Sequence, residues 1–147
     1  MKRLIKWSLI FTAIGLGAVN VGLTNSEAAL IPQVDNSIQE FWGKFSAAVI
    51  KGDKVTVAGQ TRFPVSMPYG MASVRNRTQL TKRYRTVFNG EANAAKCFAT
   101  AKPEPDPANA KSFTVACANA AGHEVVVYSF TRTATGWRFT GLDNLNE

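Results

Sequence analysis

The side chains that could carry out catalysis or bind a metal are few in this sequence. Its 147 residues include one histidine, His123, and ten carboxylates. His123 follows Gly122 in a predicted turn, where a lone histidine is usually exposed to solvent, so we predict no metal site. Glu124 begins the strand that follows and shares a face with Tyr128. Because neighbouring strand residues point to opposite faces, Glu124 and His123 do not form an acid–base pair. We therefore predict no catalytic residue and no cofactor.

The two cysteines have the spacing of a structural bridge. Cys97 and Cys117 lie on two predicted strands, Lys96 to Ala101 and Phe113 to Asn119. Folding the chain about Pro107 sets the two cysteines opposite each other. Cross-strand neighbours have Cβ atoms about 4.5–5.5 Å apart, close to the separation that a disulfide needs. We predict a Cys97–Cys117 disulfide rather than a redox pair.

The N-terminus has the order of segments found in a secretory signal. Three basic residues within the first six are followed by an uncharged apolar run from Trp7 to Leu23. Ser26 and Ala28 then supply the small residues of a cleavage site. We predict a signal peptide at residues 1–28 and a single domain at 29–147. The mature chain is expected in the periplasm or the medium, with no stable membrane anchor after cleavage.

The net charge of the chain limits the classes of partner that we expect it to bind. The formal net charge is +7, and no block of like charges occurs. An exported protein rarely meets nucleic acid, so we predict no nucleic-acid partner. The excess of positive charge instead favours an anionic envelope polymer or an acidic small molecule.

Three helices are predicted before the main strands. Ser37 to Glu40 reads as a capping box, and the apolar residues that follow recur at helical spacing until Gly52. Asp53 can cap a second, short helix that ends near Gly59 and has Val55 and Ala58 inward. A third helix runs from about Thr78 to Asn89 and ends at Gly90.

The remaining chain alternates as strands do. Arg62 to Val65 contains Pro64, which restricts that segment to a sheet edge. Met71 to Arg75 is a second short strand. The four main strands are predicted at Lys96 to Ala101, Phe113 to Asn119, Glu124 to Arg132 and Gly136 to Leu142.

The last hairpin divides its residues between two faces. Its turn sets Phe130 opposite Phe139 and Arg132 opposite Trp137. The face that packs on the helices is predicted to contain Val126, Tyr128, Phe130, Trp137 and Phe139. The open face is predicted to contain Val125, Val127, Ser129, Thr131, Arg138, Thr140 and Leu142.

Beside this order of elements, the sequence contains the segments Phe41-Trp42-Gly43-Lys44-Phe45, Gly52-Asp53-Lys54 and Thr61-Arg62-Phe63-Pro64-Val65, and the hairpin Val127-Tyr128-Ser129-Phe130 to Gly136-Trp137-Arg138-Phe139. In these features the chain resembles the nuclear transport factor 2-like superfamily. The resemblance implies an α+β fold, with a cone-shaped, curved antiparallel sheet of four main strands wrapped around three N-terminal helices. The superfamily includes isomerases, dehydratases and scaffolds, so the fold does not set the function.

The resemblance also places a pocket inside the cone. The matching ligand-binding positions are Trp42, Arg62, Tyr69, Tyr84, Tyr128 and Trp137. We first expect an exported, non-catalytic domain that binds a small molecule or an anionic envelope component in this aromatic pocket. We also expect a homodimer that forms through the open face of the sheet.

Two other classes of function remain open. One is an enzyme of the lyase or isomerase type, with Glu124 or a tyrosine as acid or base. The other is a protein-interaction module, such as an inhibitor or immunity factor, that acts through the proline-rich loop at 102–107. An empty apolar cavity would favour ligand binding, whereas an interior filled by its own rings would favour the interaction module.

Overall fold

The computed structural model describes the chain from Asp35 onward, with short gaps. The described residues are 35–68, 72–119, 121–123 and 125–145, all within one structural unit, Pro32–Glu147. The predicted signal peptide, Tyr69 and Glu124 lie outside them. None of the helices in these ranges is long and apolar enough to cross a bilayer.

Helix α1 (Asn36–Lys51) begins earlier than the capping box predicted. Asp35 caps it, because its carboxylate accepts a 2.9 Å hydrogen bond from the Ser37 backbone N–H. The Ser37 hydroxyl donates to the same carboxylate, and Glu40 pairs with Lys44 at 2.6 Å. Both side chains of the proposed box are therefore used elsewhere. The helix ends at Gly52, as predicted, in the left-handed conformation with φ of 69°.

Helix α2 (Lys54–Gly59) is capped by Asp53, which accepts a 3.0 Å hydrogen bond from the Thr56 N–H, as predicted. The inward face differs from the prediction. Val55 is 80% exposed, and Val57 is buried beside Ala58 instead. Ala58 is inward as predicted, so only the placement of Val55 was wrong.

Helix α3 (Arg77–Asn89) ends at Gly90, but not for the reason expected of a helix-terminating glycine. Gly90 has a φ of −75°, which any residue adopts. A Cβ built there would lie 2.5 Å from the carbonyl oxygen of Thr86. The position therefore needs glycine because the backbone approaches itself too closely for a side chain.

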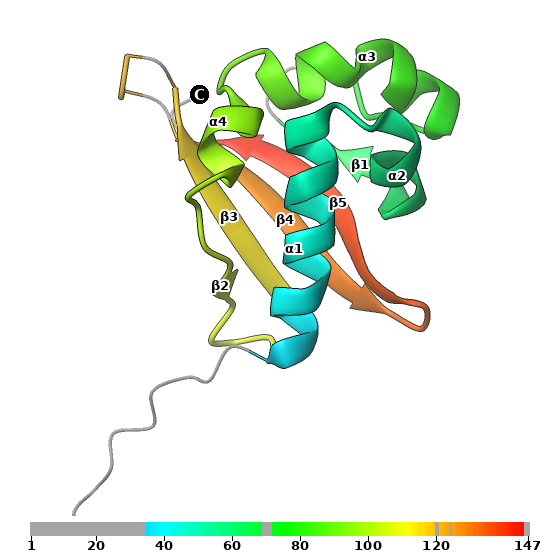
Figure 1. Ribbon diagram of the computed structural model, residues 1–147, viewed down its shortest axis with the longest axis vertical. Helices are drawn as coiled ribbons and strands as arrows, with labels where there is room; N and C mark the ends of the chain where they lie inside the picture. The colour runs from blue at the N-terminus through cyan, green and yellow to red at the C-terminus, as the bar shows by residue number, and fades with distance from the viewer. Residues whose placement is uncertain (1–34, 69–71, 120, 124, 146–147) are drawn as a thin grey trace, which may run out of the picture. The chain divides into compact units, whose positions relative to one another are not determined.

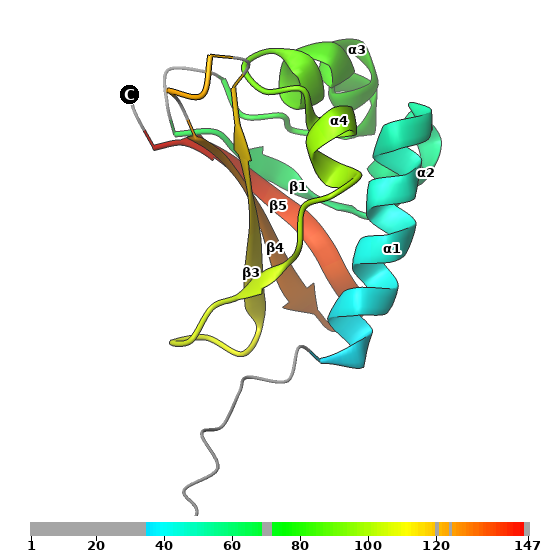
Figure 2. The same ribbon diagram turned by 60° about the vertical axis from the view of Figure 1, so that its left-hand side comes forward.

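The sheet has five strands in the order β1-β5-β4-β3-β2. The strands are β1 (Thr61–Ser66), β2 (Glu104–Pro105), β3 (Ser112–Ala118), β4 (Val125–Thr133) and β5 (Gly136–Asn144). Only β1, the predicted edge strand, runs parallel to its neighbour. The second short strand is reduced to a single bridge between Val65 and Val74. The sheet curves behind α1, and the helices lie on one side of it (Figures 1 and 2).

The predicted strand at Lys96 to Ala101 is wrong. Its first half is helix α4 (Ala94–Phe98), capped by Asn93, which accepts a 2.9 Å hydrogen bond from the Lys96 N–H. Ala94 and Phe98 are four residues apart and both buried, which is helical rather than strand spacing. The α+β class is confirmed. The sheet, however, is mixed, with three long strands and two short edge strands instead of four main antiparallel ones.

The β4–β5 hairpin has the predicted register near its turn. Phe130 pairs with Phe139 and Arg132 with Trp137, and these aromatic rings are buried. Further along, Ser129 pairs with Gly141, which leaves Thr140 as an extra residue in a β-bulge.

The bulge corrects one prediction about the open face of the sheet. It changes the alternation, so that Leu142 pairs with Tyr128. Leu142 is 2% exposed and lies among the core residues rather than on the open face.

Candidate functional site

The interior predicted to hold a pocket is filled with aromatic rings. Phe45, on α1, is fully buried at its centre. Its ring centroid lies 5.1 Å from that of Phe130, 5.7 Å from Phe41 and 5.8 Å from Phe139. Phe113 stacks on Phe130 at 4.6 Å. These are the separations of directly packed rings, so α1 and the sheet share one core here.

Trp42 and Tyr84 are part of this core, and their polar tips are bonded within it. The Trp42 indole N–H donates to the Ala101 carbonyl at 3.3 Å, and the ring packs edge-on against Phe98. The Tyr84 hydroxyl donates to the Val49 carbonyl at 3.3 Å. Burial raises the pKa of Tyr84 to about 12, and the negative charge of Asp53 adds to the shift. Tyr84 therefore stays protonated at physiological pH.

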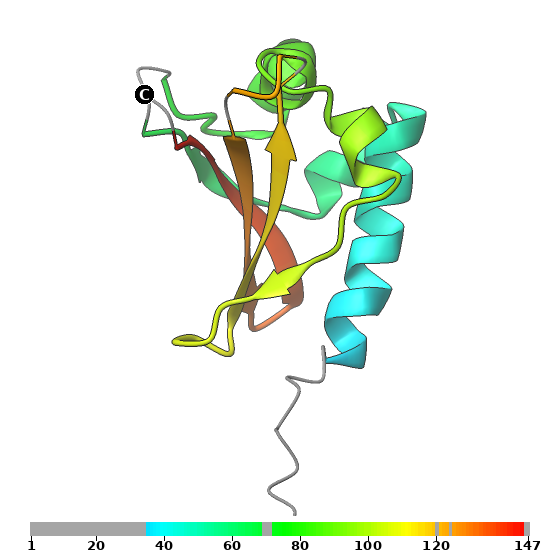
Figure 3. The same ribbon diagram turned by 90° about the vertical axis from the view of Figure 1, so that its left-hand side faces the viewer.

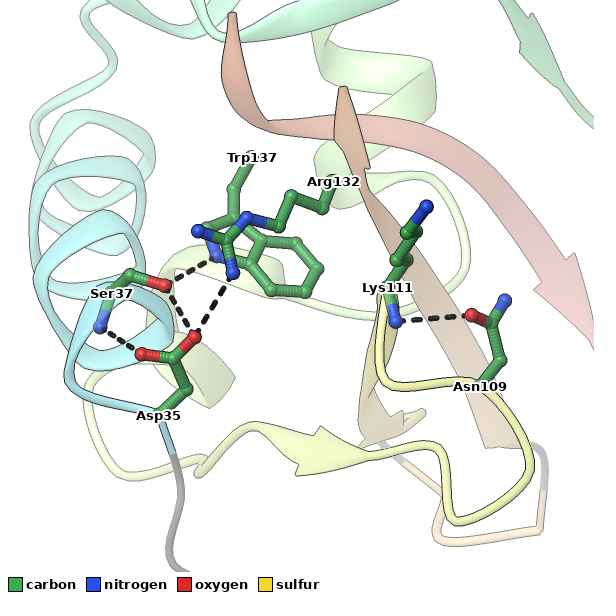
Figure 4. A network of polar contacts seen from close by, with 6 residues as sticks. All are labelled: Asp35, Ser37, Asn109, Lys111, Arg132 and Trp137. Carbon is green, nitrogen blue, oxygen red and sulfur yellow. Dashed lines mark hydrogen bonds and ion pairs between the residues drawn. The ribbon is translucent and has the colours of Figure 1, made fainter. Parts of the chain in front are cut away.

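Trp137 connects the sheet to the start of α1 (Figure 4). Its indole N–H donates to the Ser37 hydroxyl at 2.9 Å, and Ser37 in turn donates to Asp35. Arg132 completes the network with a 3.2 Å ion pair to Asp35 and lies over the Trp137 ring. The pKa of Asp35 is lowered, first by the Ser37 backbone N–H, then by the Ser37 hydroxyl, and to a lesser extent by Arg132.

The other predicted ligand-binding residues have different environments. Tyr128 is 1% exposed and packs against Phe98 with ring centroids 4.9 Å apart. Arg62 is exposed, on the side of β1 that faces away from the core. The structure thus brings Trp42, Tyr84, Tyr128 and Trp137 into one core cluster and leaves Arg62 outside it.

The predicted disulfide is confirmed, but it joins different elements from those expected. Cys97 and Cys117 are bonded, with Cα atoms 5.8 Å apart. In the sheet, Cys117 pairs with Val126 on β4, whereas Cys97 belongs to α4. The bridge therefore fastens a helix to β3 rather than linking two strands.

A groove that the sequence analysis missed lies beside this disulfide. It has a volume of about 830 Å³ and separates α4, with the residues that follow it, from the end of β3. Its lining residues are Asn93, Lys96, Cys97, Ala99, Thr100, Ala101, Ala116, Ala118 and Asn119. The sequence signal was the repeated alanine in both segments, because small side chains leave space between two elements.

The floor of the groove is a partly open strand edge. Strand β2 pairs only with Phe113 and Thr114, and Asp106 adds one hydrogen bond to the Ser112 carbonyl. Because backbone groups alternate along a strand, Ala116 directs its N–H and C=O to the same side as Ser112 and Thr114. In Figure 3 this edge faces the viewer, with the yellow-green β2 beside the lower part of β3.

The Cys97 sulfur lies near this edge without satisfying it. It is 3.6 Å from the Ala116 carbonyl oxygen. A disulfide sulfur has no proton to donate, so the carbonyl keeps its capacity to accept a hydrogen bond. Among the described residues, the backbone hydrogen bonds outside the sheet and the helices include none from Ala116 or Ala118.

Comparison with known proteins finds similar solved structures at low levels of identity. No family model matches the sequence, and no curated protein matches it. Solved structures with similar folds include a nuclear transport factor 2-like protein with a cystatin-like fold from Novosphingobium aromaticivorans, at 16% identity over 74% of this chain and 79% of that one, with a TM-score of 0.43.

Two further structures are similar at the same level. A domain of unknown function with a cystatin-like fold from Nostoc punctiforme has 14% identity over 76% of each chain and a TM-score of 0.43. A hexachlorocyclohexane dehydrochlorinase has 11% identity over 74% of this chain and 82% of that one, with a TM-score of 0.44.

Proposed function

We propose that this chain is an exported, non-catalytic interaction module that binds an extended segment of a partner protein along the open edge of β3. The observation that carries the proposal is the contrast between the interior and the edge. The rings that would line an internal pocket pack on one another, and Trp42, Tyr84 and Trp137 use their polar tips in internal hydrogen bonds. The edge of β3 beyond Thr114 is instead bordered by a groove.

A peptide strand suits this groove because both its backbone and its side chains would find partners. Its backbone would pair with the N–H and C=O of Ala116 and Ala118, extending the sheet beyond β2. The small side chains of Ala99 and Ala101 leave space for the side chains of the added strand. The proline-rich segment 102–107 is not the binding element in this proposal. It contains β2, which already pairs with the first half of the β3 edge and so restricts a partner strand to the second half.

The charge of the groove selects an acidic segment. Lys96 is the one charged side chain among the lining residues, and it is exposed. A carboxylate in the bound strand would pair with it, so the preferred partner is an extended segment that contains Asp or Glu. Such a pair, at an exposed rim, would contribute more to selectivity and association rate than to affinity.

Export and dimerisation are separate parts of the proposal. The Cys97–Cys117 bridge is typical of an oxidising compartment, which supports export. A homodimer through the open face of the sheet would use part-exposed side chains such as Val125 and Val127. That face does not include the β3 edge, so the two interactions are compatible.

The test is selection of peptides from a displayed random library on the folded, oxidised protein. We expect enriched peptides to be rich in strand-forming residues and to contain Asp or Glu. Ala116→Pro removes the outward N–H while leaving the bonds to β4, and proline is tolerated at edges. We expect it to weaken binding of the selected peptides by roughly tenfold, the effect of about one hydrogen bond.

Two charge variants distinguish binding in the groove from a general attraction of the protein for acidic peptides. Lys96→Glu should weaken binding, whereas Lys82→Glu, an equal change on exposed α3, should not. Thermal unfolding of each variant confirms that it is folded. Failure to enrich any peptide, or equal affinity of the selected peptides for the wild type and for both Ala116→Pro and Lys96→Glu, would contradict the proposal.

A further inference from the structure

We propose a second, independent binding site on the outer side of the sheet: a site for a small oxyanion, held by Arg62 and Arg138. Both arginines line one hollow of about 510 Å³, together with the hairpin residues Thr133, Ala134 and Thr135. This site shares no residue with the β3 groove, so either proposal can fail without the other.

The register of β1 and β5 explains why the two arginines meet. Thr61 pairs with Phe139, and both point into the core. Because side chains alternate along a strand, Arg62 and Arg138, each next to one member of this pair, point to the opposite, outer side. Neighbouring strands lie about 5 Å apart, so two long side chains can reach the same point above them.

Hydrogen bonds hold the Arg138 guanidinium in place. One terminal nitrogen donates to the Trp137 carbonyl at 2.7 Å, and the other donates to the Thr135 hydroxyl at 3.0 Å. The Thr133 hydroxyl, 3.2 Å from that of Thr135, donates to the Gly136 carbonyl at 2.7 Å. These bonds use two of the five N–H groups of Arg138, so an ordered donor set with three N–H groups remains.

The hollow has positive charge and no carboxylate in its lining. Among the described residues the two ion pairs are Lys44–Glu40 and Arg132–Asp35, so neither Arg62 nor Arg138 takes part in one. Two guanidinium groups that face one hollow repel each other, and a bound anion would convert this repulsion into attraction. Guanidinium groups match the geometry of phosphate and carboxylate oxygens, which they bind in pairs.

The ligand class is therefore a compound with a phosphate group or with closely spaced carboxylates. One guanidinium would bind from β5 and the other from β1, while the methyl group of Ala134 contacts the uncharged part of the ligand. The shallow hollow is open to solvent, so we expect a dissociation constant in the millimolar range for the isolated anion, and a marked weakening at higher ionic strength.

The experiment is a two-dimensional NMR titration of the full mature chain with inorganic phosphate, with malonate and with chloride, at constant ionic strength. We expect saturable shifts of the backbone amides of residues 62 and 133–138 with phosphate or malonate and none with chloride. The anion that saturates the shifts at the lower concentration shows whether phosphate or carboxylate is the preferred group.

Matched variants make the result specific. Arg62→Gln and Arg138→Gln should each weaken binding roughly tenfold, as expected for the loss of charge-assisted hydrogen bonds. Arg62→Lys, which keeps the charge without the fork, should fall between them and the wild type. Arg85→Gln, an exposed charge on α3, is the control. Linear shifts that never saturate, or an equal loss in Arg85→Gln, would overturn the proposal.

Discussion

The replacement Phe45→Ala tests the claim that the aromatic interior is packed rather than hollow. Phe45 has no exposed surface. Five rings surround it with centroid distances of 5.1–6.4 Å: Phe130, Phe41, Phe139, Phe88 and Phe98. Phe-to-Ala changes in cores cost about 3–5 kcal/mol, the higher values occurring where the surroundings do not collapse. With rings contributed by α1, α3, α4 and two strands, we expect a loss of about 4 kcal/mol.

The assay is chemical and thermal unfolding of the oxidised protein with and without benzene. A loss of that size should lower the melting temperature by roughly 15 °C or more for a domain of this length. Benzene should stabilise the variant, because it fills an apolar cavity the size of a ring, and should leave the wild type unchanged. Phe45→Leu, with an expected loss of about 1–2 kcal/mol, serves if the alanine variant is unfolded.

The opposite results would refute the reasoning. Val55→Ala, at an 80% exposed position, is the control and should change stability by less than about 0.5 kcal/mol. If Phe45→Ala costs no more than Val55→Ala, the interior is not packed around Phe45. If benzene stabilises the wild type, an empty apolar pocket already exists, and binding of a small molecule inside the sheet becomes the favoured function.

Three further predictions concern the remaining supports of the fold. Replacing Cys97 and Cys117 together by alanine should lower the free energy of unfolding by about 3 kcal/mol, because the disulfide closes a loop with a sequence separation of 20; an unchanged urea midpoint would count against this. Gly90→Ala should destabilise the fold by about 1–3 kcal/mol through its clash with the α3 backbone. Gly43→Ala, in open space on α1, should stabilise it by about 0.5–1 kcal/mol. Thermal unfolding compares the two variants, and similar effects would show that the backbone does not approach Gly90 closely. The pKa of Asp35 is lowered in the folded state, so its contribution is complete above the unfolded pKa of about 4 and disappears as the pH falls through the lower folded pKa; the stability curves of wild type and Asp35→Asn should therefore converge at low pH, and parallel curves would contradict the assignment.

Local patterns in the sequence predicted most of the fold correctly. The hairpin register followed from its turn and from alternation. The disulfide was predicted correctly from a pairing of two strands, although Cys97 lies on helix α4. The strand predicted at Lys96 to Ala101 failed because six residues carry too little periodicity to separate a strand from one helical turn. The cap at Asn93 was the signal for the helix.

Other features depend on tertiary contacts that a single sequence does not display. The bulge at Thr140 shifts Leu142 to the core side, and no residue type in that segment indicates the bulge. The repeated alanines were a signal for the groove, but they do not show that α4 lies beside the end of β3, which creates it. Trp42, Tyr84, Tyr128 and Trp137 were correctly placed inside, whereas Tyr69 lies outside the described residues. The number of rings alone did not show whether they would line a space or fill it.

The network in Figure 4 has a consequence for how the chain acquires its structure. Ser37 bonds to Trp137, and Asp35 to Arg132, across separations of 100 and 97 residues. Contacts this distant in sequence are slow to form, and during synthesis the first helix has to wait for the β4–β5 hairpin to emerge. Nascent chains that end before this hairpin would therefore leave the N-terminal turn of that helix unanchored, and the domain would complete its folding only once the hairpin has emerged.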